Sequence, residues 1–304
     1  MNKIYDVIII GSGPAGLSAA VYAQRARLET LIIEKSMMSG GQVLTTYEVD
    51  NYPGLPGVSG FDLGMKFREH ADHLGAEFII DEVLRIEDKG SHKLVICEEG
   101  AYETKTVIIA SGAAHRKLDV PGEQEFTGVG VSYCATCDGA FFRNKVTAVV
   151  GGGDVALEDA IFLARVCPKV YVIHRRDTFR GAKSLQDKLL SLENVEVIWD
   201  TVVDEIVGED SVSGLKLTNK KTGEKSELAV DGVFIAVGIR PNSEEYTGNV
   251  EMEHGYIVAG EDCRTSEPGI FAAGDVRTKQ LRQIVTAVSD GANAITSVER
   301  YLNS

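Results

Sequence analysis

The chain contains the same short pattern twice, and this repeat constrains its fold more than any other feature. Residues 4–10 form a β-branched apolar run, followed at once by the turn Gly11-Ser-Gly-Pro-Ala-Gly16 and an Ala-rich helical stretch. Residues 146–150 form a second apolar run, followed by Gly151-Gly-Gly-Asp-Val-Ala156 and another helical stretch. A buried strand, a glycine turn of this spacing and a helix are typical of a dinucleotide-binding unit. We therefore predict an α/β fold with two Rossmann-like, three-layer nucleotide-binding domains.

Each unit is also closed by a matching strand. Residues 106–113 and 233–241 are apolar runs that finish in a glycine turn. A single glycine turn is weak support, because such turns are common. Two of them, each between a strand and a helix and each followed by a closing strand, are not a coincidence.

The order of these segments predicts that the second domain is inserted into the first. The tail after residue 243 has no nucleotide-binding unit of its own, so we expect it to return and complete the first domain. The predicted first domain comprises residues 1–113 and 243–304, and the inserted domain comprises residues 114–242. Two connections between two compact bodies make relative rotation the default expectation.

Composition excludes several classes of partner. The chain has 304 residues and a net charge of −14, which repels nucleic acid and anionic lipid, so we expect neither as a partner. The N-terminus lacks the ~7–15 apolar residues of a signal peptide. No apolar run approaches the ~18 residues of a membrane span. We therefore expect a cytoplasmic protein, whose acidity mainly keeps it soluble.

Cysteine usage singles out one pair. The five cysteines form neither an even structural framework nor a four-ligand zinc pattern, so we expect no metal site. Cys97 and Cys167 lie among apolar residues and are expected to be buried, and Cys263 is assigned no role. Cys134 and Cys137 form a C-x-x-C pair, which in a reducing compartment is more often catalytic than structural.

An acidic residue directly follows this pair. Asp138 adjoins Cys137 and can donate or accept a proton as thiolates form and leave. The alternative is that Asp138 is only a turn residue before Gly139. For the cysteines themselves, the alternative is a structural bridge or half of a zinc site.

The first glycine turn predicts a site for FAD or NAD(H). Its glycines provide a tight turn, close approach of the backbone to a pyrophosphate, and close packing of helix on strand. The pyrophosphate would then lie at the positive N-terminus of the helix. The second strand of this unit ends at Glu34, whose carboxylate can bind ribose hydroxyls and would repel a 2′-phosphate. The alternative is a solvated charge at a strand end.

The second glycine turn predicts a site for NADP(H). The strand after it ends at His174-Arg175-Arg176, and Arg180 follows four residues later. Cations at this position match a 2′-phosphate. The alternative is a basic, solvated turn.

A third segment adds support for a flavin. The apolar run 270–273 ends in Gly274-Asp275, and an Asp at such a strand end can reach a flavin ribityl hydroxyl. An Ala-rich helical stretch over 286–301 follows, and its N-terminus would favour negative charge on a reduced flavin. The Gly-Asp pair is weak by itself, and gains weight from the two glycine turns.

The chain resembles the bacterial low-molecular-weight thioredoxin reductases over essentially its full length. The matching segments are Gly11-Ser-Gly-Pro-Ala-Gly16, Gly40-Gly41-Gln42, Tyr52-Pro53-Gly54, Cys134-Ala-Thr-Cys137-Asp138, Gly151-Gly-Gly-Asp-Val-Ala156, His174-Arg-Arg-Asp-Thr-Phe-Arg180, Ala273-Gly-Asp-Val276 and Arg282-Gln283.

This resemblance implies a homodimer that reduces thioredoxin. Electrons would pass from NADPH to FAD, then to the disulfide of Cys137 and Cys134, and finally to thioredoxin. Cys137 would lie nearer the flavin, Cys134 would attack the thioredoxin disulfide, and Asp138 would protonate the leaving thiolate. The family alternates between two domain orientations, and the two-connection layout is compatible with that motion.

The resemblance also implies the cofactor contacts. For FAD, in the first domain, they are Gly11, Ser12, Gly13, Pro14, Ala15, Glu34, Gly41, Gln42, Asn51, Val83, Gly112, Asp275, Arg282, Gln283 and Ile284. For NADPH, in the inserted domain, they are Gly152, Gly153, Asp154, Val155, Ala156, His174, Arg175, Arg176, Arg180 and Gly238.

There are two alternative functions. One is a flavin thioredoxin reductase fed by ferredoxin, or a dithiol oxidase that uses oxygen, both of which have a degraded NADPH site. The intact second glycine turn and its arginines speak against them. The other is a redox-sensing flavoprotein in which the cysteines act as a switch, and substitution of the cysteines separates it from an enzyme.

Overall fold

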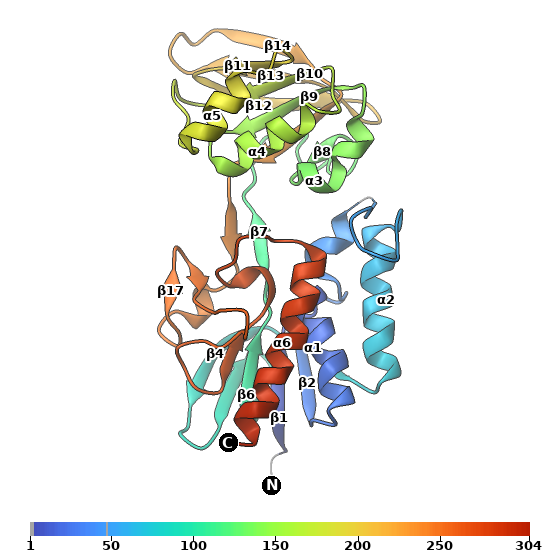
Figure 1. The fold of residues 1–304 in the computed structure, drawn as a ribbon, viewed down its shortest axis with the longest axis vertical. Coiled ribbons are helices and arrows are strands. Elements are labelled where there is room, and N and C mark those ends of the chain that lie inside the picture. The colour runs from blue at the N-terminus through green and yellow to red at the C-terminus, as the bar shows by residue number, and fades with distance from the viewer. Residues whose placement is uncertain (1–2, 47) are drawn as a thin grey trace. The chain divides into compact units, whose positions relative to one another are not determined.

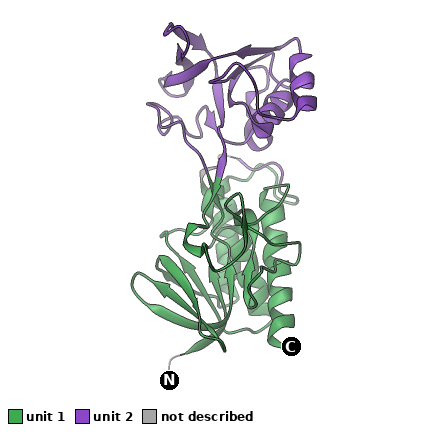
Figure 2. Cartoon of the chain, turned by 90° about the vertical axis from the view of Figure 1, so that its left-hand side faces the viewer, with its two compact units in different colours: residues 1–44, 52–114, 240–304 green, residues 45–51, 115–239 purple. Residues whose placement is uncertain are grey.

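The protein divides into two compact units. The computed structural model describes residues 3–46 and 48–304. Unit 1 comprises residues 1–44, 52–114 and 240–304, and unit 2 comprises residues 45–51 and 115–239 (Figure 2). One glycine turn of the repeat lies in each unit. The short segment 45–51 groups with unit 2, which the sequence pattern did not indicate.

Unit 1 is built on a seven-stranded sheet in the order β3-β2-β1-β6-β5-β4, with β19 also paired to β6. Its strands are β1 (Ile4–Ile10), β2 (Thr30–Glu34), β3 (Glu77–Ile80), β4 (Val83–Asp88), β5 (Lys93–Cys97), β6 (Ala101–Ile109) and β19 (Ile270–Ala272). β6 divides its length between two neighbours, because its first half pairs antiparallel with β5 and its second half pairs parallel with β19. The segment after residue 240 thus contributes a strand to the first sheet.

Three long helices belong to unit 1: α1 (Pro14–Arg25), α2 (Gly60–His73) and α6 (Ile284–Leu302). α1 and α6 lie side by side on one face of the sheet, with α2 beyond α1 (Figure 1). α6 approaches α1 closely at Gly291, where a Cβ would lie 2.2 Å from the carbonyl oxygen of Ala15. Only glycine permits this crossing, and the crossing brings α6 to the start of α1.

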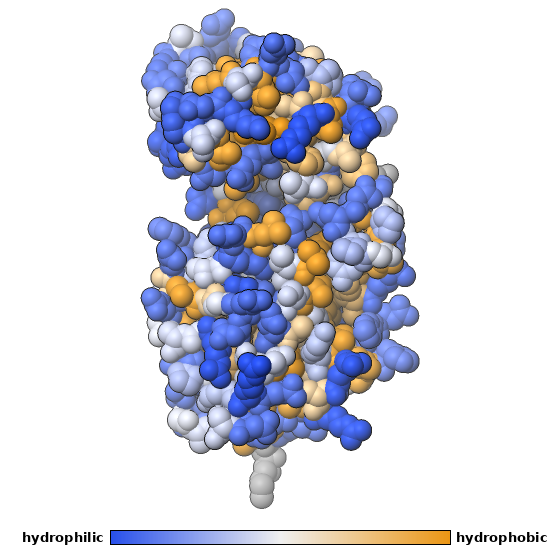
Figure 3. Space-filling model, viewed as in Figure 1, coloured by the Kyte–Doolittle hydropathy of each residue, from blue (hydrophilic) through white to orange (hydrophobic). Residues whose placement is uncertain are grey.

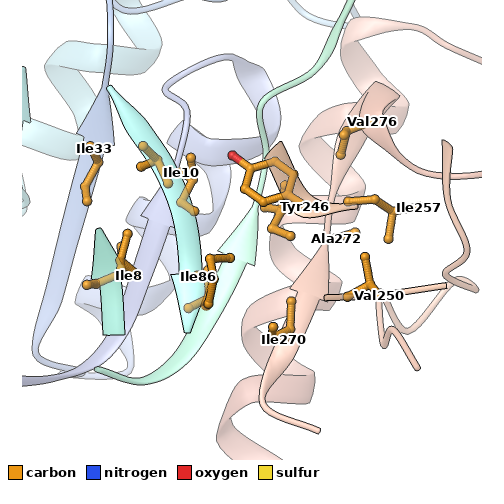
Figure 4. Close-up of a cluster of buried hydrophobic side chains, with 14 of the residues drawn as sticks. Ile8, Ile10, Ile33, Ile86, Tyr246, Val250, Ile257, Ile270, Ala272 and Val276 are labelled. Atoms are coloured by element: carbon orange, nitrogen blue, oxygen red, sulfur yellow. The ribbon is translucent and has the colours of Figure 1, made fainter. Parts of the chain in front are cut away.

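The sheet of unit 1 buries apolar side chains on both faces. Along β1, Val7 and Ile9 face the helices, while Ile8 and Ile10 face the opposite layer, as the two-residue period of a strand requires. Figure 4 shows this second core, in which Ile8 and Ile10 lie with Ile86 of β4 and with residues from the C-terminal segment. The three layers predicted for the first domain are present.

Unit 2 repeats this architecture. Its main sheet is parallel, in the order β11-β10-β9-β15-β8, and a three-stranded antiparallel sheet, β12-β13-β14, forms the other layer. The strands are β8 (Val131–Ser132), β9 (Val146–Gly151), β10 (Lys169–Ile173), β11 (Val195–Ile198), β12 (Thr201–Gly208), β13 (Val212–Asn219), β14 (Lys225–Ala229) and β15 (Gly232–Ala236). The helices are α3 (Ala135–Asp138), α4 (Asp154–Leu163) and α5 (Lys183–Leu190).

The two main sheets share a strand order. In unit 1 the strands run β3-β2-β1-β6, and in unit 2 they run β11-β10-β9-β15, so each has its first strand between its second and its closing strand. This is the 3-2-1-4 order of a Rossmann half, in which the ligand lies at the carboxyl ends of the strands. The predicted fold class is confirmed.

Short elements complete the chain. Two-stranded sheets are formed by β7 (Ala113–His115) with β16 (Ile239–Pro241), and by β17 (Met252–Glu253) with β18 (Tyr256–Ile257). Single 3₁₀ turns are η1 (Gly41–Thr45), η2 (Gly139–Phe142), η3 (Glu244–Tyr246) and η4 (Gly274–Val276). Hydrophilic side chains cover most of the face drawn in Figure 3, with small apolar groups between them. Within 3–46 and 48–304, no helix is long and apolar enough to cross a bilayer.

Candidate functional site

The glycine turn of unit 1 forms an open cradle at the start of α1. Gly11 has φ +100°, and a Cβ there would lie 2.5 Å from the carbonyl oxygen of Ala110. Gly13 caps α1 without a side-chain hydrogen bond, and a Cβ there would meet no atom within 4 Å. The first turn of α1 contains no acidic residue, and Pro14 stands at its start. Free backbone N–H groups facing open space are the features of an anion site.

Glu34 is fixed beside this turn. Ser12 donates two hydrogen bonds to Glu34 Oε2, from its backbone N and from its Oγ, both at 2.8 Å. The backbone N of Ser36 donates to Oε1 at 3.0 Å. Glu34 is therefore an ordered carboxylate at the end of β2, and a freely solvated charge is the wrong description.

The Gly40-Gly41 segment closes one side of the cradle. The N–H of Gly40 donates to the carbonyl oxygen of Ser12 at 2.8 Å. Gly41 has φ +59°, and its Cβ would lie 3.3 Å from the Cα of Gly13. This contact brings two predicted segments, 11–16 and 40–42, together from positions about thirty residues apart.

Asp275 lies in the turn η4, against the start of α1. Its Oδ1 is buried and has no hydrogen-bond partner among the described residues. Burial raises the pKa of Asp275, while the nearby charges of Lys279 and Arg282 oppose that rise. Gly274 has φ +79°, and a Cβ there would lie 2.9 Å from the Cβ of Ala15.

Arg282 presents a second unpaired polar atom. Its Nε is buried without a hydrogen-bond partner in the described chain, and its guanidinium lies 4.2 Å from the ring centre of Tyr256. Gln283 caps α6 and forms a capping box with Thr286, and Ile284 is the first residue of that helix. A buried unpaired acceptor and donor beside an open glycine turn fit a flavin dinucleotide, which offers both hydroxyl donors and acceptor oxygens.

The other residues predicted to contact FAD lie at several separate points of the chain. Gly112 follows β6 with φ +71°, and Val83 is a buried residue that opens β4. Gln42 lies in η1. Asn51 falls in the segment that groups with unit 2.

The cysteine pair forms a disulfide at the start of α3. Cys134 and Cys137 are joined, and both are half-buried. Cys134 is the N-cap of this single turn and makes no side-chain capping bond of its own. The backbone N of Cys134 donates to Ser132 Oγ at 3.1 Å. The structure thus holds the oxidised form of the pair.

Asp138 is the last residue of α3, directly after Cys137, and its carboxylate is shielded from solvent. Ser132 Oγ donates to its Oδ2 at 2.6 Å, and its Oδ1 is buried without a partner among the described residues. Burial raises the pKa of Asp138, and the Ser132 hydrogen bond partly offsets that rise. A carboxyl with a raised pKa can carry a proton to or from the sulfurs. These contacts distinguish Asp138 from an ordinary turn residue.

The glycine turn of unit 2 repeats the first one. A Cβ on Gly151 would lie 2.4 Å from the carbonyl oxygen of Ala236, and Gly153 faces open space as the N-cap of α4. Asp154 Oδ1 accepts a hydrogen bond from the N of Ala182 at 2.6 Å, and Val155 is exposed. The carbonyl oxygen of Gly152 accepts from the N of Arg180 at 2.8 Å, which anchors the basic loop beside the glycine turn.

The basic loop divides into an inward and an outward part. The ring of His174 is buried and packs against Phe179 and Trp199. Its Nε2 forms a 3.0 Å hydrogen bond with the carbonyl oxygen of Thr178. Arg175, Arg176 and Arg180 are exposed. His174 therefore supports the loop from within, and the three arginines are the cations available to a ligand. Gly238 has φ +126° and lies against the side chain of Arg116.

Comparison with known proteins identifies the family. The profile of the family described as pyridine nucleotide-disulphide oxidoreductase matches residues 5–291. A thioredoxin reductase of Listeria monocytogenes is 48% identical over 303 residues, covering 99% of this chain and 95% of that protein. The thioredoxin reductase of Bacillus subtilis is 46% identical, covering 99% and 96%. The chain belongs to the thioredoxin reductases.

A solved thioredoxin reductase also shares the fold. The enzyme from Streptococcus pyogenes is 49% identical, covers 100% of this chain and 99% of its own, and superposes with a TM-score of 0.94. As a thioredoxin reductase, the chain is an oxidoreductase that works with a flavin, a pyridine nucleotide and a disulfide.

Some features of this thioredoxin reductase were missed by sequence reasoning. Asp159 of α4 is buried and accepts a hydrogen bond from the backbone of Ala135, the first residue of the disulfide turn. Burial raises the pKa of Asp159 to about 7. A charged residue inside an otherwise apolar helix was the available signal. Asp290 of α6 was missed in the same way.

Within the described part of the chain, the remaining three cysteines are free thiols. Cys97 and Cys167 are buried, as expected, and Cys263 is buried as well although its sequence surroundings are polar. Burial raises the pKa of Cys97 and of Cys263 to about 12, which keeps both thiols protonated and unreactive.

Proposed function

We propose that this thioredoxin reductase is an NADPH-dependent thioredoxin-disulfide reductase. The observation that carries the proposal is the Cys134–Cys137 disulfide beside Asp138, whose Oδ1 is buried and unpaired. A reversible disulfide next to a proton-carrying carboxyl is what thiol–disulfide exchange with a partner protein requires.

The cradle of unit 1 would hold FAD. Gly11, Gly13 and the N-terminus of α1 would bind its pyrophosphate, and Glu34 would bind a ribose. Asp275 and Arg282 would contact its flavin half. When bound, FAD would supply the two-electron relay between the nicotinamide and the cysteine pair. The remaining predicted FAD contacts are proposed from the resemblance alone. They are Ser12, Pro14, Ala15, Gly41, Gln42, Asn51, Val83, Gly112, Gln283 and Ile284.

The choice of NADPH over NADH rests on the basic loop. Arg175, Arg176 and Arg180 are exposed beside the second glycine turn, where they would bind a 2′-phosphate. Glu34 stands at the corresponding position of the first turn and would repel that phosphate. The two turns therefore prefer different dinucleotides. The same arginines argue against a ferredoxin-fed reductase, which would need no such site.

The chain's own residues then carry out the exchange. Reduction opens the disulfide to two sulfurs, one as a thiol and one as a thiolate. The Cys134 thiolate attacks the thioredoxin disulfide, which forms a mixed disulfide and releases one thioredoxin thiolate. Asp138 gives that thiolate a proton. Asp138, now a carboxylate, takes the proton of the Cys137 thiol. The Cys137 thiolate then attacks Cys134, which restores the internal disulfide and releases the second thioredoxin sulfur as a thiolate, so that thioredoxin leaves in its reduced form.

Assembly as a homodimer and a cytoplasmic location complete the proposal. Both are proposed from the resemblance to the bacterial thioredoxin reductases. We propose thioredoxin as the protein substrate and expect neither nucleic acid nor membrane as a partner.

A single assay tests flavin, donor and acceptor together. The purified protein should carry FAD and should reduce thioredoxin with NADPH. Cys134→Ser and Cys137→Ser should each abolish this turnover while FAD stays bound. Retained turnover in both variants would contradict the proposal. Turnover that needs reduced ferredoxin in place of NADPH would favour the ferredoxin-fed alternative.

A further inference from the structure

A buried ion cluster lies next to the turn that carries Asp275. Its centre is Asp290 of α6, which is 4% exposed. Asp290 Oδ2 accepts hydrogen bonds from the N of Gly274, from Arg277 Nε and from Lys279 Nζ, and Oδ1 accepts from Arg277 Nη2. These four contacts measure 2.7–2.9 Å. One carboxylate therefore binds the backbone of η4 and both cations that follow it.

The charged side chains of this cluster are hydrogen-bonded to protein groups and shielded from solvent. The side chains of Arg277 and Lys279 are 9% and 7% exposed. Arg277 Nη1 donates to the carbonyl oxygens of Ala259 and Thr278, at 3.1 and 3.0 Å. Burial acts to raise the pKa of Asp290, but hydrogen bonds from Arg277 and Lys279 outweigh it and lower the pKa. Asp290 is thus a permanent anion at this place.

Asp290 also connects the two halves of the flavin cradle. Its neighbour Gly291 packs on the carbonyl oxygen of Ala15, in the first turn of α1. On its other side, Asp290 holds the N–H of Gly274, whose Cα faces the Cβ of Ala15. Val276, on the far side of Asp275, is buried in the core next to Ile257 (Figure 4). The residues before and after Asp275 are therefore both fixed.

Stability alone does not account for such a cluster. Buried ion pairs lose solvation when the chain folds, and well-packed apolar residues of similar size often stabilise a core as well or better. What a multi-contact ion cluster does provide is a defined geometry. The residue whose geometry it defines here is Asp275, whose Oδ1 is buried without a hydrogen-bond partner among the described residues.

We propose that Asp290, with Arg277, is a positioning residue that holds the Gly274-Asp275 turn in the geometry that binds FAD. This inference rests on the proposed function, because it takes the cradle of unit 1 to be the FAD site. A hydrogen bond from a ligand hydroxyl to Asp275 requires placement within about 0.5 Å, which a loosened turn would lose.

The test compares Asp290→Asn with a matched variant elsewhere in unit 1. Lys93 is 6% exposed and pairs with Asp88 and Glu267, so Lys93→Met also removes a buried charge that makes two ion pairs, although its two partners are more exposed than those of Asp290. For each holoenzyme we would measure the FAD dissociation constant, the positions of the flavin absorption bands and Tm. Asp290→Asn should raise the dissociation constant by about 10-fold or more and shift the bands. Lys93→Met should lower Tm with less than about a 2-fold change in FAD affinity.

Equal effects of the two variants on FAD affinity at equal loss of Tm would overturn the proposal. Lys279→Met serves if Asp290→Asn does not fold, because it removes one donor from Asp290 and leaves the Arg277 contacts intact. It should weaken FAD binding in the same sense, by a smaller factor, and an unchanged FAD affinity and spectrum would count against the proposal.

Asp275→Ala separates this inference from the proposed function. If the wild-type protein carries no FAD, or if Asp275→Ala binds FAD as tightly as wild type, the assignment of the cradle is at fault. If Asp275→Ala weakens FAD binding while Asp290→Asn and Lys279→Met do not, only the positioning role is wrong.

Discussion

Ser132 donates a 2.6 Å hydrogen bond to one carboxylate oxygen of Asp138 and leaves the other buried without a partner in the described chain. The same hydroxyl accepts from the backbone N of Cys134 at 3.1 Å. One serine therefore orients both the proposed acid and the first cysteine. We therefore expect proton transfer by Asp138 to make thioredoxin turnover depend on pH.

Asp138→Asn should lower thioredoxin turnover by about 100-fold or more, because the amide cannot carry the proton. FAD content and the disulfide should be unaffected. Steady-state turnover with NADPH and thioredoxin, measured across pH, would check this. The alkaline limb that reflects loss of the Asp138 proton should vanish from the profile.

Ser132→Ala should shift that limb in a defined direction. The hydrogen bond from Ser132 lowers the pKa of Asp138 against the effect of burial, so its removal raises the pKa further. The acid then stays protonated to higher pH, and the alkaline limb should move upward. A limb that stays in place would show that the titrating group is not Asp138.

The double substitution Arg175→Ala with Arg176→Ala should raise the KM for NADPH roughly 10–100-fold, because it removes two charge-assisted contacts to the 2′-phosphate. The KM for NADH should change little. Lys183→Ala is the control, since Lys183 is exposed and already pairs with Asp187. An unchanged preference for NADPH over NADH in the double variant would contradict the assignment.

Substitutions at two neighbouring glycines should separate an effect on stability from an effect on nucleotide binding. A Cβ on Gly152 would lie 2.2 Å from the buried ring of His174, so Gly152→Ala should destabilise the protein by about 1–3 kcal/mol. A Cβ on Gly153 meets no atom within 4 Å, so Gly153→Ala should keep Tm near that of wild type. It should nevertheless weaken NADPH binding, because the methyl group projects where the pyrophosphate would approach. Thermal unfolding and NADPH titration would measure the two effects.

Asp159 should make the stability of the protein fall as pH rises through neutrality. Burial raises the pKa of Asp159 from 3.8 to about 7, so the folded chain binds this proton more tightly than the unfolded chain. Its contribution is complete below about pH 4 and is lost as pH rises through about 7.

Asp159→Asn removes this dependence. Relative to wild type, the variant should gain on the order of 2–4 kcal/mol between pH 4 and pH 8. Denaturant unfolding of both proteins at the two pH values gives the difference. A difference that is constant with pH would show that folding does not raise the pKa of Asp159.

The sequence by itself determined the fold class and the residue types available for binding and redox chemistry. Two glycine turns, each set between a β-branched strand and an Ala-rich helix, predicted both nucleotide-binding folds, because these patterns are local and few structures satisfy them. The burial of Cys97 and Cys167 was also predictable, because apolar residues surround both of them in the sequence. So were the different strand ends, Glu34 and Arg175-Arg176, that distinguish the two sites.

Only the tertiary structure decided how these residues are supported. His174 lies in a basic run, yet its ring turns inward under Gly152, and only the arginines of this run are exposed. Asp159 meets Ala135, and Asp290 meets Gly274, across 24 and 16 positions of sequence. Such contacts depend on how one helix crosses another element, and a crossing of that kind leaves no periodic pattern in the sequence. The motifs predict the classes of ligand, and long-range packing fixes the positions of the atoms that we propose to bind them.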